Sequence, residues 1–396
     1  MIRSNRFYVS ASYFMLFFCV GSFMPFLSLF LRNHGWSGVQ LGLYASIGPF
    51  IALATQPLWG LLCDTLGDTK KVYAGLLAGV IISVLVFAAL PATGIFFLLA
   101  ALLGLLQSPL MPLLDTMALK TLDAGRSELG AMRLWGSFSF AVVSSIMGAI
   151  FVISERSIFL VFAFGALIAI FFARHLEGGV PAEAGEARAR LTWNSLRSVL
   201  NRPLMVFLGL VFLLQLGHGM ALSFLSIVMA DRGASSTIIG YTWSITALIE
   251  IPVFFLLGRL LRRFSPVLVL ALGGFITTVR LVCFVAAPTP FFMLLAQNID
   301  GIAFPLLLIP GVLIVHELVP PRWQTTGQTI YAAVGSTLPR VIGGVWGGRI
   351  IDVFGGIALY TLCGVLTLTA ACALVLYNRS FQQNRRQVQA IEPAVP

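Results

Sequence analysis

The chain has 396 residues, of which 58% are hydrophobic and 10% are charged. A soluble globular domain has about 45–50% hydrophobic and about 25% charged residues, so this composition excludes an ordinary water-soluble protein. The formal net charge of +10 is spread over short segments between long apolar runs. That pattern favours orientation in a lipid bilayer over binding to nucleic acid. The composition therefore predicts an all-α membrane protein.

Apolar runs long enough to cross a bilayer divide the chain into twelve predicted helices, because a core of about 30 Å requires about 20 residues. They cover residues 8–31, 41–63, 71–91, 94–118, 131–153, 157–174, 204–230, 238–258, 266–287, 290–316, 328–351 and 355–377. The first run is too long for the core of a signal peptide and has no cleavage site of small residues after it. We therefore expect it to be a retained helix.

Lysine and arginine are unequally divided between the loops on the two sides of these helices. Eighteen lie on one side and three on the other, with four more inside helices. Because these residues resist translocation, the asymmetry predicts that both termini and the loop 175–203 are cytoplasmic. The expected location is a cell membrane, most simply the inner membrane of a bacterium.

An internal repeat relates the two halves of the chain at an offset of 198 residues. Eleven of 37 positions are identical, beginning with Phe26-Leu27-Ser28 on Phe224-Leu225-Ser226. Because the first and seventh helices match in the same direction, we expect two parallel six-helix bundles related by an axis along the membrane normal. The predicted units are residues 1–174, a cytoplasmic connector 175–203, residues 204–377 and a cytoplasmic tail 378–396.

The segment after the second helix carries a recognisable motif. Its sequence, GLLCDTLGDTKK, begins at Gly60 and resembles the Gly-x-x-x-Asp-x-x-Gly signature of the major facilitator superfamily. The resemblance implies a fold of two pseudo-symmetric six-helix bundles that move about a central substrate site. Because the motif lies at the membrane surface, we expect it to latch neighbouring helix ends as a gate. Its gating residues would be Gly60, Asp64, Gly67, Lys70 and Lys71.

A narrower resemblance comes from two segments, Ser108-Pro109-Leu110-Met111-Pro112-Leu113-Leu114-Asp115 and Arg133-Leu134-Trp135-Gly136-Ser137. Together they resemble the phenylpropionate permease branch, which is similar to lactose permease and related proton symporters. This resemblance implies proton-coupled uptake of a small organic solute, such as an aromatic acid, a sugar or a nucleoside. It also implies that Asp115 and Arg133 bind substrate. The alternative for these two residues is an ion pair that gates or stabilises the cytoplasmic side.

Ionisable residues inside membrane helices are rare and costly, so each is a candidate for function. In the second half these are Glu250, Arg280, Asp300 and Arg340, which suggests that carboxylates and guanidinium groups pair with one another. Since Arg keeps its proton, protonation of a carboxylate would free its partner and couple one proton to an anionic substrate. The alternative is a permanent structural cluster. His218, between two glycines, is either a functional or a packing residue.

The candidate residues form two groups. Proton-coupling candidates are Glu250, Asp300, His218 and Asp115. Substrate-binding candidates are Arg280, Arg340, Arg133, Asp115, Gln56, Gln215, Gln297, Trp135 and Trp243. Relatives in the phenylpropionate branch often have a histidine on the tenth helix, where this chain has Asp300, so the identity of the proton carrier stays open.

Several activities are excluded by missing motifs. The chain has no phosphate-binding loop, and His316-Glu317 lacks the second histidine of a zinc protease because Pro320 stands in its place. We therefore expect no enzyme, no metal and no cofactor. The leading hypothesis is a proton symporter, acting as a monomer, for an aromatic carboxylate. The alternatives are a symporter for sugars or nucleosides, a multidrug efflux antiporter, and a membrane sensor that does not transport.

Overall fold

A computed structural model of the chain describes residues 2–66, 68–122, 126–176, 201–320 and 323–391. Ten helices in these ranges are long and apolar enough to cross a membrane. One of them, Thr326–Gln383, contains two spans, because Gly355 breaks the helix with a φ of 81°. The shorter apolar helix Ser157–Ala173 adds another. Ten plus these two gives twelve spans, as the sequence predicted.

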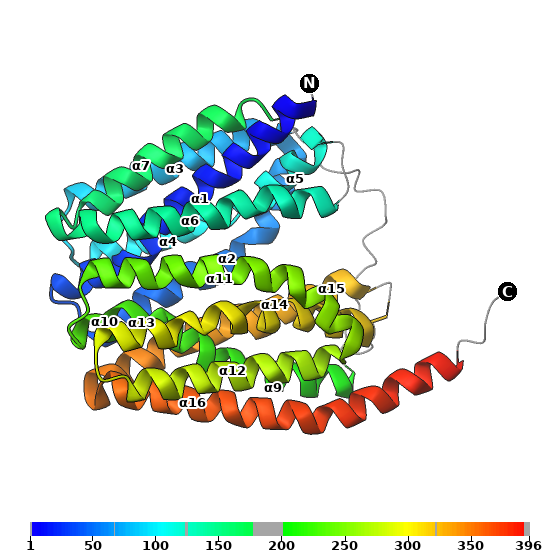
Figure 1. Cartoon of the computed structure of the whole chain (residues 1–396). Helices are drawn as coiled ribbons and strands as arrows, with labels where there is room; N and C mark the ends of the chain where they lie inside the picture. The colour runs from blue at the N-terminus through cyan, green and yellow to red at the C-terminus, as the bar shows by residue number, and fades with distance from the viewer. Residues whose placement is uncertain (1, 67, 123–125, 177–200, 321–322, 392–396) are drawn as a thin grey trace.

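The first half of the chain forms one bundle, in the upper part of Figure 1. Its helices are α1 (Ile2–Asn33), α2 (Gly38–Leu66), α3 (Thr69–Ala89), α4 (Ile95–Gln107), α5 (Leu110–Leu122), α6 (Arg126–Ile153) and α7 (Ser157–Ala173). Interlocking aromatic rings fill its centre. Phe87, for example, stacks on Phe159 at 5.9 Å and meets Phe96 edge-on at 4.5 Å. Such pairs add to the free energy gained by burying their area.

The second half forms the lower bundle (Figure 1). Its helices are α9 (Arg202–Ser223), α10 (Leu225–Asp231), α11 (Ser236–Arg263), α12 (Pro266–Ala286), α13 (Pro290–Asn298), α14 (Asp300–Leu318), α15 (Gln324–Ala332), the π-helical turn η2 (Ala333–Thr337) and α16 (Leu338–Ile391).

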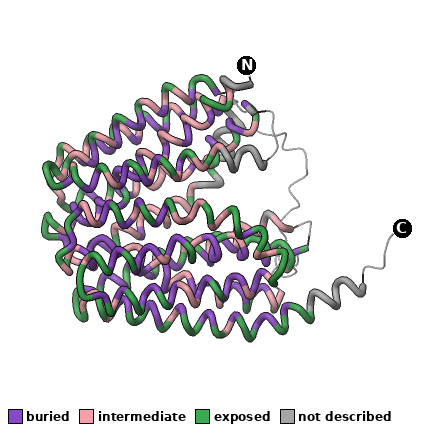
Figure 2. Tube along the Cα trace, viewed as in Figure 1, coloured by how far each residue is buried: buried purple, intermediate pink, exposed green. Residues whose placement is uncertain are grey.

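The outer surfaces of both bundles carry apolar side chains, and Phe164, Leu167 and Val282 are each at least 60% exposed. Figure 2 shows exposed positions along the outer helices. These faces suit contact with lipid.

Three predicted spans are broken into two helices each. The span 94–118 breaks between α4 and α5, where Pro109 has no N–H to donate. The span 204–230 breaks at Phe224, and the span 290–316 breaks at Ile299. Discontinuous helices of this kind line the midplane sites of many transporters.

The repeat is visible in the backbone. Gly35 and Gly233, 198 residues apart, have φ values of 85° and 86°. Each ends a helix in the same way: Trp36 N donates to Leu31 O over 3.2 Å, and Ala234 N donates to Met229 O over 2.9 Å. Such turns require a left-handed residue, which glycine adopts without strain. Helices α2 and α11 also begin 198 residues apart, at Gly38 and Ser236.

The two bundles meet along α6 with α11 and along α2 with α16. We name the end of the molecule where α1 leads into α2 the Gly38 end, and it lies on the left of Figure 1. The opposite end, which holds Leu176 and Asn201, is the connector end. Close packing between the halves occurs toward the Gly38 end: a Cβ on Gly42 would overlap the carbonyl of Gly344. The structure therefore has its halves joined at the Gly38 end.

Candidate functional site

Four polar side chains singled out from the sequence meet in the interior of the second half. Arg280 on α12, Asp300 on α14, His218 on α9 and Gln297 on α13 are all buried. Arg280 Nη1 donates a hydrogen bond to Gln297 Oε1 over 2.8 Å and lies 3.5 Å from Asp300 Oδ1. The same Asp300 oxygen lies 3.6 Å from His218 Nδ1. We call these four residues the buried charge cluster.

The buried charge cluster combines fixed and changeable charge. Arg280 is fully buried and keeps its proton, so a change of net charge falls on Asp300 or His218. Asp300 opens α14 directly after the break at Ile299, where the helix dipole favours a carboxylate. Among the described residues, Asp300 Oδ1, both His218 ring nitrogens and Arg280 Nε and Nη2 lack a hydrogen-bond partner. A cluster that leaves buried polar atoms unsatisfied contributes little stability, which points to a functional role.

The expected mutual pairing of carboxylates and guanidinium groups holds for Arg280 with Asp300 but is wrong for Glu250 and Arg340. Neither of the latter two forms an ion pair within 4.0 Å in the part of the chain that the structure describes. Glu250 is half-buried on α11. Arg340 lies near the start of α16 and is exposed as a residue, and its Cγ lies beside Gly219 of α9.

A second group of polar residues lies in the first half. Arg133 Nη1 of α6 is 3.7 Å from Asp115 Oδ2 of α5, and their side chains are 48% and 28% exposed. The hydroxyl of the buried Tyr13 on α1 donates to Asp115 Oδ1. Tyr13 could not be selected from the sequence, because a tyrosine in an apolar helix is an ordinary packing residue. This accessible group offers both a hydrogen-bond acceptor and donors.

The motif after α2 makes contacts within its own half. Lys71 Nζ lies 3.1 Å from Asp68 Oδ2, and Lys70 Nζ donates to the carbonyl of Arg174 over 3.1 Å. Asp68 also caps α3, and the backbone N–H of Lys71 is the main cause of the lowered pKa of its carboxyl group. Lys70 therefore joins the start of α3 to the end of α7, whereas the contact of Lys71 with Asp68 lies within the first turn of α3.

Other predicted residues lie apart from these groups or outside what is described. Gln215 is half-buried on α9, one turn before His218. For Gln56, Gly60 and Asp64 only the helical backbone of α2 is described, and Gly67 lies outside the described residues.

Residues 7–362 match the MFS_1 like family, which is most of the chain. The chain belongs to this family. It is a secondary transporter of the major facilitator superfamily rather than an enzyme, and it is a multi-pass membrane protein. The superfamily and the all-helical fold expected from the sequence are thus confirmed.

Similar proteins include transporters for different solutes. The transporter is 29% identical over 370 residues to "Maltose permease" of Geobacillus stearothermophilus, with 92% of each chain covered. It is 28% identical over 275 residues to "Probable 3-phenylpropionic acid transporter" of Escherichia coli (strain K12), covering 67% of this chain and 70% of that protein. A crystal structure of a variant of the nucleoside transporter NupG is similar with a TM-score of 0.84 at 17% identity, covering 94% and 99% of the chains. That last likeness shows the fold alone.

The two tryptophans chosen as cavity candidates occupy different surroundings. Trp135 is 51% exposed and shares one face of α6 with the exposed Phe138 and Ile146, three and eleven residues further on. That apolar stripe suits lipid better than a polar cavity. Trp243 is half-buried on α11 and donates from Nε1 to Ser226 Oγ over 3.3 Å. Since Ser226 Oγ also donates to a carbonyl of α1 in the other half over 2.6 Å, Trp243 lies where the halves meet.

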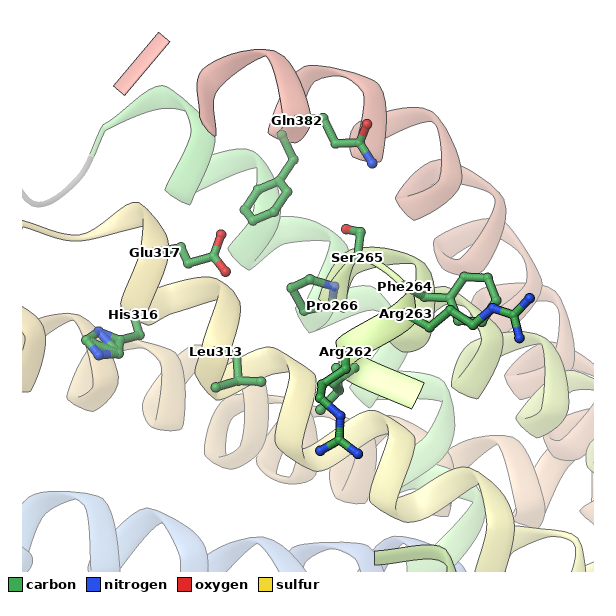
Figure 3. A pocket seen from close by; sticks show the side chains of 11 residues that line it. Arg262, Arg263, Phe264, Ser265, Pro266, Leu313, His316, Glu317 and Gln382 are labelled. Carbon is green, nitrogen blue, oxygen red and sulfur yellow. The ribbon is translucent and has the colours of Figure 1, made fainter. Parts of the chain in front are cut away.

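A cavity of about 600 Å³ opens at the connector end of the second half. Figure 3 shows that its walls come from the ends of α11, α12, α14 and α16. It contains none of the candidate substrate residues. His316 in its wall is 16 residues from Asp300 along α14, about 24 Å at 1.5 Å per residue. The cavity is therefore separate from the buried charge cluster.

Proposed function

We propose that this transporter is a proton symporter that imports a small organic solute, with Asp300 as the group that carries the proton. The observation that supports this most directly is the buried charge cluster. A carboxylate 3.5 Å from a fully buried guanidinium and 3.6 Å from an imidazole can change its charge and alter both contacts.

The proposed coupling step follows from the chemistry of the pair. When Asp300 takes up a proton, its attraction to Arg280 falls, while Arg280 keeps its charge and its hydrogen bond to Gln297. The cluster lies where α9, α12, α13 and α14 pack together, so a change in this pair alters contacts between four helices. Protonation of one residue thereby biases how the second bundle packs, which is what coupling to a rocking motion requires.

We further propose that the connector end faces the cytoplasm, in line with the distribution of Lys and Arg, and that both termini lie there. The bundles 1–174 and 204–377 would act as the two moving units, joined by 175–203 and followed by the tail 378–396. Because the halves are joined at the Gly38 end, this conformation would admit solute from the cytoplasmic side. The transporter would work as a monomer in a bacterial inner membrane.

The substrate we propose is a small aromatic carboxylate, bound through Arg340. Arg340 has no carboxylate within 4.0 Å of its guanidinium among the described residues, so its charge is available to a ligand. An arginine can bind a carboxylate through two parallel hydrogen bonds. The similarity to a probable 3-phenylpropionic acid transporter supports this class. Binding an aromatic acid and its amide analogue tests it, and equal affinity for the two would contradict it.

A neutral sugar is the second candidate, favoured by the group in the first half. Asp115 and Arg133, whose side chains are 28% and 48% exposed, present an acceptor and donors that suit hydroxyl groups, and the buried Tyr13 hydroxyl orients Asp115. The similarity to a maltose permease over 92% of both chains supports this class. Uptake of maltose that does not compete with aromatic acids would favour it.

The coupling proposal is tested in proteoliposomes with Asp300→Asn. We expect this variant to exchange labelled substrate across the membrane but to lose accumulation driven by a proton gradient, because exchange does not require release of the proton. Glu250→Gln is the matched control, since Glu250 is a membrane carboxylate outside the buried charge cluster. Normal accumulation by Asp300→Asn would move the proton site to Glu250, and normal accumulation by both variants would move it to His218 or Asp115. Binding without any exchange in the wild type would indicate a sensor, and export driven by the gradient would indicate an efflux antiporter.

A further inference from the structure

At the Gly38 end, a carboxylate of one half caps a helix of the other. Asp352 of α16 accepts hydrogen bonds from the backbone N–H groups of Gly38, over 2.7 Å, and Val39, over 2.9 Å, which are the first two residues of α2. Arg32, at the end of α1, lies 3.9 Å from the same carboxylate. Asp352 therefore joins the helix N-terminus and a cation of the first half to the second half.

The first turn of α2 needs this carboxylate for a definite reason. Ser37 and Gln40 form a reciprocal capping box, in which Ser37 N donates to Gln40 Oε1 over 2.9 Å and Gln40 N donates to Ser37 Oγ over 3.2 Å. This box does not use the N–H groups of Gly38 and Val39. Asp352 accepts from both, and its negative charge is also favoured at the positive end of the helix.

The close approach depends on glycine. A Cβ on Gly38 would lie 2.7 Å from Asp352 Oδ1 and 2.5 Å from the carbonyl oxygen of Gly348. Both distances are too short for a side chain, so a residue larger than glycine would force α2 and α16 apart. The contact is thus specific to the conformation in which the Gly38 end is closed.

The repeat-related contact, at the start of α11, is made by hydroxyl groups. Helix α11 has its own cap, since Ser235 Oγ accepts from Ile238 N over 3.3 Å. Its first residue, Ser236, donates from Oγ to the carbonyl of Gly148 in α6 over 2.9 Å. Both α2 and α11 thus dock by their first turn on the opposite half. At α2 this docking uses a carboxylate, which adds charge to the hydrogen bonds.

The backbone caps contribute more than the ion pair. Arg32 and Asp352 have side chains that are 33% and 26% exposed, and their 3.9 Å separation is long. The contact of Arg32 with Asp231, also at 3.9 Å, is more exposed still. Partly exposed pairs of this kind contribute little, because water screens them. Two charge-assisted hydrogen bonds under 3 Å are the stronger element.

We propose that Asp352 is a conformation-dependent cap of α2 that stabilises the state closed at the Gly38 end and is released whenever that end opens. Opening separates the two halves there, so Asp352 must leave Gly38 and Val39, whose N–H groups then bind water. Asp352 is thus a positioning residue that sets the balance between the two conformations of the transport cycle. This inference is independent of the substrate and of the coupling ion.

The test is the rate at which a membrane-impermeant maleimide labels a cysteine between the halves from the Gly38 side. The reporter is Ala45→Cys, a half-buried position one turn beyond Gly42 on α2, in a chain whose five natural cysteines are replaced. Vesicles of both orientations allow labelling from each side. If the Gly38 end opens and closes quickly, the rate from its side is proportional to the open population.

We expect Asp352→Ala to raise this rate by about two- to thirty-fold, the change that corresponds to loss of a helix cap. Asp352→Glu, which keeps a carboxylate, should have a labelling rate near that of the wild type. Asp352→Asn, which keeps the size and one acceptor oxygen, should give a smaller rise and serves if the alanine variant does not fold. The control is Glu155→Gln, at the same end, because Glu155 accepts from Asn33 within the first half. Unchanged rates in Asp352→Ala and Asp352→Asn, or an equal rise in the control, would overturn the proposal.

Discussion

Removing either member of the Arg280–Asp300 pair leaves an isolated charge in the interior of the second bundle. In Asp300→Asn the guanidinium, which is 0% exposed, would keep only the Gln297 amide oxygen at 2.8 Å. In Arg280→Gln the carboxylate, which is 3% exposed, would keep only His218 at 3.6 Å. Breaking a buried ion pair in this way costs about 3–5 kcal/mol. The double variant has no buried charge, so we expect it to lose no more stability than either single variant.

The assay is a double-mutant cycle on the free energy of unfolding, measured in mixed micelles of mild detergent and dodecyl sulfate. The matched control cycle uses Asp115→Asn and Arg133→Gln, a pair at 3.7 Å whose side chains are 28% and 48% exposed. For that pair we expect a coupling energy of about 0–1 kcal/mol, because water screens it. Additive losses at Arg280 and Asp300, or equal coupling energies in the two cycles, would refute the argument that the first pair is held by burial.

Other predictions address substrate, gate and positioning. Arg340→Lys should weaken binding of an aromatic acid by about ten- to 150-fold, measured by calorimetry, because lysine cannot form two parallel hydrogen bonds. Gly42→Ala should hinder closure at the Gly38 end, because its Cβ would overlap the carbonyl of Gly344. The rate of maleimide labelling from that side should therefore rise. Gly48→Ala, whose Cβ has no neighbour within 4 Å, is the control. Tyr13→Phe should raise the Michaelis constant for transport while leaving expression unchanged, because it removes a hydrogen bond to the carboxylate beside Arg133.

The number and order of the helices were predictable from the sequence, and some of the breaks were not. A run of about 20 apolar residues has few alternatives to a membrane helix, so all twelve spans were found. The break before α5 has a visible cause in Pro109, which cannot donate a backbone hydrogen bond. The breaks at Phe224 and Ile299 have none, because neither residue opposes a helix by itself. They depend on how neighbouring helices pack.

The site was predictable as a set of rare charges but not as a set of contacts. Arg280 and Asp300 stand out in the sequence because charges in apolar helices are costly. Arg280 and Asp300 pair with each other, whereas Glu250 and Arg340 do not. This difference depends on the rotation and depth of four helices, which cannot be predicted from sequence periodicity alone. Asp352 could not be chosen at all. A carboxylate at a helix end is typical of any exposed surface, and its role appears only when α2 is seen to begin beside it.

The two halves share a backbone plan but differ in the placement of charge, and this difference fits a division of roles. Helices α6 and α15 begin 198 residues apart, at Arg126 and Gln324, yet Arg133 corresponds to Tyr331. Asp115 likewise corresponds to Leu313. The two halves therefore share the arrangement of their helices, but the first half holds an accessible charged pair and the second a buried one. In the function we propose, the buried pair would respond to a proton by changing how helices pack, and the accessible pair would be open to a solute. Proton-coupled transport as proposed would require both kinds of pair, and two identical pairs would supply only one.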